Sequence, residues 1–328
     1  MAALSQGRRV YVHYESRNSP YRDGVAIGVA AQSSEGSVKS EATVSKTFGD
    51  RLIKASRAND SLLCIGLDPV RAWFPSPLDA EPDVTRAIVS FNAGVIAATS
   101  DLVCAYKPNL GFYLAYGAAG VAALEETRRL IPAHIPVILD AKVGDIGSTA
   151  EAYATGYFDT WDFDAVTVNP YLGEDSLAPF LTRHDRGVLV VCKTSNPGSA
   201  DLQNLSLHAN DGQQPLYLTV ADRVADWAER WPATLGLVVG ATYPTELAEV
   251  RHRCPNAPIL LPGIGAQAGD LEASLHAGLD SRGLGLIVSS SRSVIYADNG
   301  DGVDWTAAVR AAAIDLRESI NGVRAAQV

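Results

Sequence analysis

The stretch IPVILDAKVGDIGST, residues 135–149, joins a short apolar run to a group of closely spaced charges. Its apolar part, residues 135–139, is typical of a buried strand. Asp140 and Lys142 would lie on one face of that strand, because strand side chains alternate with a period of two. Asp145 comes later, where a turn begins, and so can face another surface. Charges beside a buried strand are costly to desolvate unless they are paired, so this stretch indicates a reactive site.

Short apolar runs of the same kind recur along the chain. Including residues 135–139, there are eight, and the others are 62–67, 102–106, 164–168, 187–192, 235–239, 258–262 and 283–288. Helical spacing separates them, for example at 83–99, 118–130, 216–230, 245–253 and 305–320. Strands with little polar alternation, separated by helices, are typical of a parallel sheet buried on both faces. The pattern predicts an α/β fold, a (β/α)8 TIM barrel over residues 45–328, with an open doubly wound sheet as the alternative.

Residues 1–44 differ from the rest of the chain, since they are rich in Ser, Gly and charged residues and show no sustained period. Only residues 10–14 could form a short strand. We expect a disordered N-terminal extension rather than a second domain. Because Met1 is the only methionine, natural translation from a non-AUG codon near Val44 is a second hypothesis.

Composition excludes several classes of protein. A net charge of −10 disfavours a nucleic-acid or anionic-membrane surface. No apolar window is long enough for a transmembrane helix, and no apolar segment follows Arg8 and Arg9 as in a secretory signal, so we expect a cytoplasmic location. The four cysteines lack metal-ligand spacing, and we expect them to be buried and reduced. The six histidines likewise predict no metal site.

Polar residues follow nearly every predicted strand, at the end where barrel enzymes carry their active sites. Lys107 follows the second strand, while Asp140 and Lys142 follow the third, so these three should converge at the barrel mouth. The last two strands are followed by residues suited to phosphate, namely Gly263, Gly265, Gln267 and Arg292. Loops at these two positions of a barrel often bind phosphate through backbone amides, and arginine binds it bidentately. We therefore expect a phosphorylated small molecule as ligand.

The stretch at 140–149 resembles the Asp-x-Lys-x-x-Asp signature of the orotidine 5′-phosphate decarboxylase family, in its longer bacterial form. The resemblance covers roughly residues 46–320 and includes, in the same order, TFGDRL (47–52), IGLDP (65–69), YKPN (106–109), TSNPG (194–198) and PGIGAQ (262–267). The signature alone also occurs in related sugar-phosphate decarboxylases and aldolases, but together with the other segments it is specific. Val143 stands where many long-form members have arginine, at a variable position. The extension has no counterpart in the family pattern.

The resemblance implies a carboxy-lyase that converts orotidine 5′-monophosphate (OMP) to UMP, the last step of de novo pyrimidine synthesis, with no cofactor or metal. Lys142 would protonate C6 as carbon dioxide leaves, within a charge network of Lys107, Asp140, Lys142 and Asp145. Asp145 would reach across the interface of a homodimer with shared active sites. The implied substrate-binding residues are Asp68 and Lys107 for the ribose, Thr149 from the partner subunit, Ser195 for the pyrimidine edge, Gln267 and Arg292 for the phosphate, and Pro262.

Two other functions fit the sequence less well. A magnesium-dependent 3-keto-gulonate-phosphate decarboxylase or hexulose-phosphate synthase would need an acidic ligand two residues before Asp140, where the chain has Ile138. A catalytically silent phosphate-ligand-binding protein would lack a member of the charge network, and none is missing. Both alternatives are therefore disfavoured.

Overall fold

The computed structural model describes residues 47–209, 212–264, 271–297 and 304–326. The extension predicted at 1–44, with its short strand at 10–14, lies outside these residues. Eight parallel strands form one sheet, in the order β2-β1-β10-β9-β8-β5-β4-β3. Their bounds are β1 Leu63–Gly66, β2 Ala105–Lys107, β3 Ile138–Val143, β4 Ala165–Val168, β5 Gly187–Lys193, β8 Thr234–Val239, β9 Ile259–Pro262 and β10 Leu286–Ser290.

The two outer strands of this order, β2 and β3, also meet each other. Isolated parallel bridges join them, Tyr106 with Val137 and Asn109 with Asp140. The amide of Asp140 donates a hydrogen bond to the carbonyl of Pro108 at 3.0 Å across the same seam. The sheet is therefore a nearly closed barrel. This confirms the predicted (β/α)8 fold, and the open-sheet alternative was wrong.

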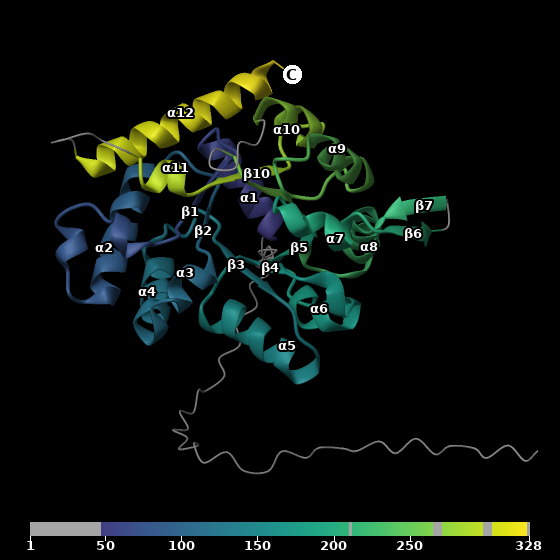
Figure 1. Ribbon diagram of the computed structural model, residues 1–328, viewed down its shortest axis with the longest axis horizontal. Coiled ribbons are helices and arrows are strands. Elements are labelled where there is room, and N and C mark those ends of the chain that lie inside the picture. The colour runs from purple at the N-terminus through teal and green to yellow at the C-terminus, as the bar shows by residue number, and fades with distance from the viewer. Residues whose placement is uncertain (1–46, 210–211, 265–270, 298–303, 327–328) are drawn as a thin grey trace, which may run out of the picture. The chain divides into compact units, whose positions relative to one another are not determined.

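Helices surround the strands (Figure 1). They are α1 Phe48–Ala58, α2 Val84–Thr99, α3 Leu110–Leu114, α4 Gly117–Leu130, α5 Gly147–Ala154, α6 Glu174–Leu181, α7 Ala200–Gln203, α8 Leu216–Arg230, α9 Pro244–Arg253, α10 Leu271–Gly278, α11 Arg292–Ile295 and α12 Trp305–Ala325. The five helical stretches predicted from spacing correspond to α2, α4, α8, α9 and α12. None of the helices in the described ranges is long and apolar enough to cross a membrane.

The strands differ from the prediction most clearly in two details. The third strand was expected at 135–139 but runs from Ile138 to Val143. Pro136 has no N–H to donate to a ladder, so regular pairing begins only after it. The structure also contains an antiparallel hairpin that was not predicted, β6 Ser206–Ala209 and β7 Gly212–Pro215. This hairpin lies beside α8 (Figure 1).

The barrel interior is filled by one apolar cluster that includes residues from, or directly beside, each of the eight barrel strands. Its members are Phe48, Leu52, Cys64, Cys104, Ala105, Ile138, Ala165, Leu189, Val238, Leu260 and Ile287. Phe48 enters from α1 and is fully buried. A Cβ at Gly187 would lie only 2.4 Å from the Phe48 ring, so glycine is required where this ring fills the N-terminal end of the barrel. All four cysteines are buried and unpaired, as predicted.

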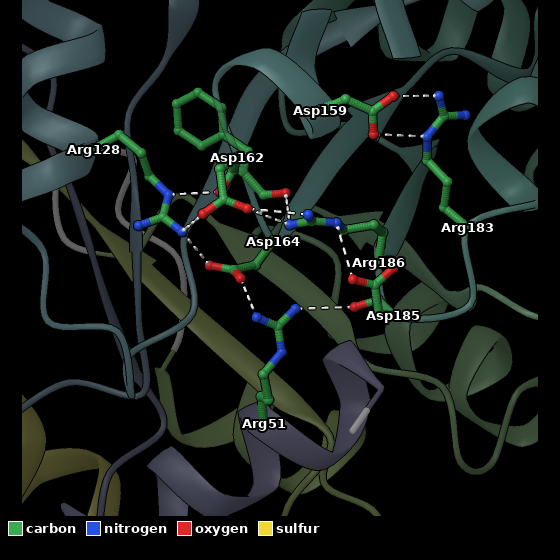
Figure 2. A network of polar contacts seen from close by, with 9 residues as sticks. Arg51, Arg128, Asp159, Asp162, Asp164, Arg183, Asp185 and Arg186 are labelled. Atoms are coloured by element: carbon green, nitrogen blue, oxygen red, sulfur yellow. Dashed lines mark hydrogen bonds and ion pairs between the residues drawn. The ribbon is translucent and has the colours of Figure 1, made fainter. Parts of the chain in front are cut away.

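A charged network covers the same N-terminal end (Figure 2). Asp164, which precedes β4, accepts hydrogen bonds from Arg51 of α1 and, at 2.8 Å, from the Val137 amide. Arg128 of α4 lies 3.5 Å from the same carboxylate, and Arg186 pairs with Asp162 at 3.0 Å. Burying Asp164 is tolerable because its charge is paired from two elements. With this end of the barrel packed and paired, the opposite end is left for a functional site.

Candidate active site

A buried carboxylate between two lysines lies at the C-terminal end of the barrel. Asp140 of β3 is 7% exposed, and each of its oxygens contacts a different ammonium group. Lys107 Nζ, from the end of β2, lies 3.2 Å from Oδ2, and Lys142 Nζ lies 2.6 Å from Oδ1. The structure therefore brings together the three residues predicted to converge there.

Two uncharged side chains complete the hydrogen bonding of Asp140. Asn109 Nδ2 donates to Oδ2 at 3.2 Å, and Thr167 Oγ1 donates to Oδ1 at 2.9 Å. Sequence reasoning assigned no role to either residue. Asn109 stands inside a quoted family segment, and Thr167 is the polar residue in the β4 run AVTV. These two signals could have identified them.

The charges around Asp140 and Lys107 favour the charged forms of both buried side chains. Burial by itself raises the pKa of Asp140, but the charges of Lys107 and Lys142 outweigh it and hold that pKa well below its ordinary value. Burial opposes the charged form of Lys107 too, yet Asp140 and then Asp68 raise the pKa of this ammonium above its usual range. Asp140 is thus anionic and Lys107 cationic at neutral pH.

The two lysines differ in exposure. The side chain of Lys107 is 5% exposed, whereas that of Lys142 is 46% exposed. Lys107 is enclosed beneath the rim of the barrel, while Lys142 opens toward the space above it. Of the two ammonium groups on Asp140, that of Lys142 is therefore the more accessible to a bound molecule.

The backbone of β3 is irregular where it carries these groups. Leu139 pairs with Val166 and Val143 pairs with Val168, so residues 140–142 stand opposite Thr167 alone. Lys142 has a φ of 45°, in the left-handed region that non-glycine residues seldom occupy. The contact between Asp140 and Lys142, expected from simple alternation, is thus made across a bulge instead.

Asp68 lies on the same rim, after β1. It is 7% exposed, and its Oδ1 accepts a hydrogen bond from the Asn109 amide at 3.1 Å. Because β1 and β2 are neighbours, Asp68 and Lys107 follow adjacent strands. The predicted ribose-binding pair is therefore positioned together.

The residues predicted to bind phosphate follow the neighbouring strands β9 and β10, which are paired. Pro262 ends β9 and is half-buried, and Arg292 begins α11 and is exposed. Gln267 lies outside the described residues. Within the described ranges Arg292 forms no ion pair with another side chain. Its guanidinium is therefore available to an anion at this rim.

Ser195 follows β5 in a half-buried position. A Cβ at Gly240 would lie 2.7 Å from the Ser195 Cβ, so glycine there allows the close approach. The preceding Lys193 was not predicted. It is fully buried, donates from Nζ to Asn204 Oδ1 at 2.9 Å and lies 4.4 Å from the centroid of the Tyr243 ring. These contacts anchor the loop that carries Ser195.

Two predicted residues lie apart from the cluster. Asp145 comes after β3, and its Oδ1 accepts a hydrogen bond from the Ile146 amide at 2.8 Å. It makes no ion pair with any other residue that the structure describes. Thr149 is exposed in the first turn of α5. The single chain therefore does not bring these two residues into contact with Lys142.

Comparisons with known proteins agree on one group of enzymes. The profile of the family described as "Orotidine 5'-phosphate decarboxylase / HUMPS family" matches residues 61–303. An orotidine 5′-phosphate decarboxylase of Thermomicrobium roseum is 53% identical over 278 residues, which are 85% of this chain and 96% of that protein. The solved structure of Leishmania donovani OMP decarboxylase has a TM-score of 0.73 and 43% identity, and covers 85% of this chain and 99% of that one. Leishmania donovani UMP synthase has a TM-score of 0.74 and 44% identity over 85% of this chain, which spans 57% of that longer chain.

Proposed function

Since the chain belongs to the orotidine 5′-phosphate decarboxylase / HUMPS family, we propose that it converts OMP to UMP and carbon dioxide without a cofactor, as the last step of de novo pyrimidine synthesis. The observation that carries this proposal is the Asp140 carboxylate held between Lys107 and Lys142 at the C-terminal end of the barrel. A magnesium-dependent member of the family is disfavoured because Ile138 occupies the position of the additional acidic ligand.

Lys142 is the proposed proton donor. When the bond between C6 and the carboxylate breaks, its electron pair stays on C6, where the pyrimidine ring stabilises it poorly. A fixed ammonium at C6 stabilises this developing charge and then transfers one proton to the carbon. The 2.6 Å contact with Asp140 holds the Lys142 ammonium in place, so little reorganisation is needed during the reaction.

The remaining rim residues are proposed to bind the substrate away from the reacting carbon. Asp68 and Lys107 would hold the ribose hydroxyls, and Ser195 would contact the pyrimidine edge. Gln267 and Arg292 would hold the phosphate, and Pro262 would be a further substrate-binding residue. Binding energy from a remote phosphate can position the ring over Lys142 and order nearby loops.

We propose a homodimer in which the partner subunit supplies Asp145 and Thr149. Two features of this chain support it. Asp145 lacks an ion pair within the described part of its own chain, although a charged network is expected to include it. Large apolar side chains are exposed on the elements around it, including Ile146 at 60% and Tyr171 at 80%. Such exposed apolar side chains are typical of an interface.

We further propose that the protein is cytoplasmic and that residues 1–44 form an N-terminal extension to the barrel. The support for the location is that four free, buried cysteines suit a reducing compartment.

One assay tests the proposed function directly. Purified protein is treated with EDTA, mixed with OMP, and followed by the loss of OMP absorbance. We expect full activity, because no step needs a metal ion. Loss of activity that magnesium restores would favour the metal-dependent members of the family, and an unchanged OMP absorbance would contradict the proposal altogether.

A further inference from the structure

We propose that Thr167 is a positioning residue, whose hydroxyl holds both the backbone of Lys142 and one carboxylate oxygen of Asp140. This inference rests on the proposed function, because it concerns the placement of the proposed proton donor. Thr167 lies at the middle of β4 and is fully buried. The sequence pattern indicates only that Thr167 is a strand residue. Its proposed role follows from the residues that it contacts in the folded chain.

The first contact explains how the bulge in β3 is held. Three residues of β3 stand opposite Thr167, so the Lys142 amide cannot pair in the regular way with the β4 backbone. It donates instead to Thr167 Oγ1 at 2.9 Å. An unpaired amide at this partly buried position would be costly, and the left-handed backbone of Lys142 is costly as well. The Thr167 hydroxyl therefore stabilises the backbone conformation from which the Lys142 side chain projects.

The second contact fixes the direction of both hydrogen bonds. Thr167 Oγ1 lies 2.9 Å from Asp140 Oδ1, the oxygen that also contacts Lys142 Nζ. Asp140 is anionic and can only accept, while the Lys142 amide can only donate. The single hydroxyl proton must therefore point to Asp140, and a lone pair must point to Lys142. The hydroxyl therefore acts as both donor and acceptor, and these two hydrogen bonds fix the orientation of its O–H bond.

Together these contacts form a closed ring. The Lys142 amide is held by Thr167, Thr167 is held by Asp140, and Asp140 holds the Lys142 ammonium. The ring fixes Lys142 at both ends of its side chain, at the backbone and at Nζ. Because Thr167 is fully buried and Asp140 nearly so, water does not readily replace the hydroxyl. Removing it should let the bulge relax and displace the ammonium from the reacting carbon.

Thr167→Val tests this, because valine keeps the shape of threonine and lacks the hydroxyl. We expect kcat to fall about 100-fold, as for a misplacement of a reacting group by about 1 Å. KM should stay within about threefold, since Thr167 is not expected to touch the substrate. Thr167→Ser keeps the hydroxyl and should retain at least about a third of the wild-type kcat.

Thr99→Val is the matched control. Thr99 is also fully buried, and its hydroxyl bonds to the Val95 carbonyl and to the Tyr106 hydroxyl, each at 2.7 Å. This variant should lose stability in urea to a similar degree while kcat stays unchanged. Such a result separates loss of a buried hydroxyl in general from loss of this one.

The proposal is overturned if Thr167→Val keeps the wild-type kcat, or if Thr167→Ser or Thr99→Val loses as much kcat as Thr167→Val. Should Thr167→Val fail to fold, Thr167→Ser and Thr167→Ala form a second pair that differs only in the hydroxyl. The same gap in kcat is expected between them, and equal values would overturn the proposal. Failure of the proposed function looks different, because the wild-type protein would then not consume OMP.

Discussion

Tyr296 donates a hydrogen bond from its phenol to the carbonyl oxygen of Asp68 at 3.1 Å. The phenol oxygen of Tyr296 in turn accepts a hydrogen bond from the Val70 amide at 2.6 Å. Tyr296 is the C-cap of the short helix α11, which begins at Arg292, so this contact joins the proposed phosphate side of the rim to the proposed ribose side. Burial raises the pKa of Tyr296, which keeps the phenol protonated as a donor.

Tyr296→Phe should therefore weaken substrate binding more than turnover. The variant keeps the aromatic stacking on Phe91 and loses both hydrogen bonds, each worth about 1 kcal/mol. We expect KM for OMP to rise about tenfold and kcat to change by less than about threefold. Tyr217→Phe, which removes a phenol bonded to Glu249 between α8 and α9, is the control and should change neither constant. A wild-type KM in Tyr296→Phe would mean that the two sides of the rim are not coupled through this residue.

Lys142→Ala should abolish turnover while the fold and UMP binding persist. Loss of the proton donor is expected to lower kcat by about 10⁴-fold or more, equivalent to about 5.5 kcal/mol of transition-state stabilisation. Single-turnover assays and UMP titration measure the two properties separately. Lys54→Ala, at an exposed position of α1, is the control and should be fully active. If Lys142→Ala kept a tenth of the activity, another group would have to donate the proton.

Arg292→Ala should mainly raise KM, with a smaller effect on kcat. A phosphate contact is present in both the ground state and the transition state, and so contributes uniform binding. Steady-state kinetics with OMP measure both constants. Arg223 of α8, whose side chain is 64% exposed, offers an arginine control away from the rim. An unchanged KM in Arg292→Ala would place the phosphate site elsewhere.

The shared active site can be tested by mixing two inactive variants, Lys142→Ala and Asp145→Ala, under conditions that exchange subunits. In a mixed dimer one site collects both substitutions, and the other combines an intact Lys142 with the partner's intact Asp145. Random exchange makes about half of the dimers mixed, so about a quarter of all sites should regain activity. If gel filtration confirms exchange and the mixture stays inactive, Asp145 acts within its own chain.

Asp164→Asn should separate stability from activity. Asp164 lies at the N-terminal end of the barrel, where it pairs with Arg51 and Arg128. Removing the charge leaves these two guanidinium groups partly unpaired, and breaking a buried pair costs about 3 kcal/mol. Urea denaturation should show this loss, while kcat at 25 °C stays at the wild-type value. A large fall in kcat without a loss of stability would connect this network to the opposite end of the barrel.

The barrel and much of its rim could be predicted from the amino-acid sequence alone. Parallel strands covered by helices must be apolar on both faces, so each appears as an apolar run whatever its neighbours are. Polar residues directly after such runs, as at Asp68, Lys107 and Arg292, must then lie at one end of the barrel. Because that placement depends only on strand direction, no knowledge of packing was needed to predict it.

How the charges are held could not be predicted, because it depends on contacts that form only in the folded barrel. The bulge at residues 140–142 depends on the register between β3 and β4, which hydrogen bonds between distant segments set. Thr167 looked like an ordinary strand residue because its importance comes from Asp140 and Lys142, which stand 27 and 25 positions away in the chain. Buried Lys193 was missed for the same reason, since its partners Asn204 and Tyr243 belong to other elements. The local sequence pattern indicates which side chains are buried or polar. It does not indicate which buried polar groups pair with one another, because those groups come together only when the barrel closes.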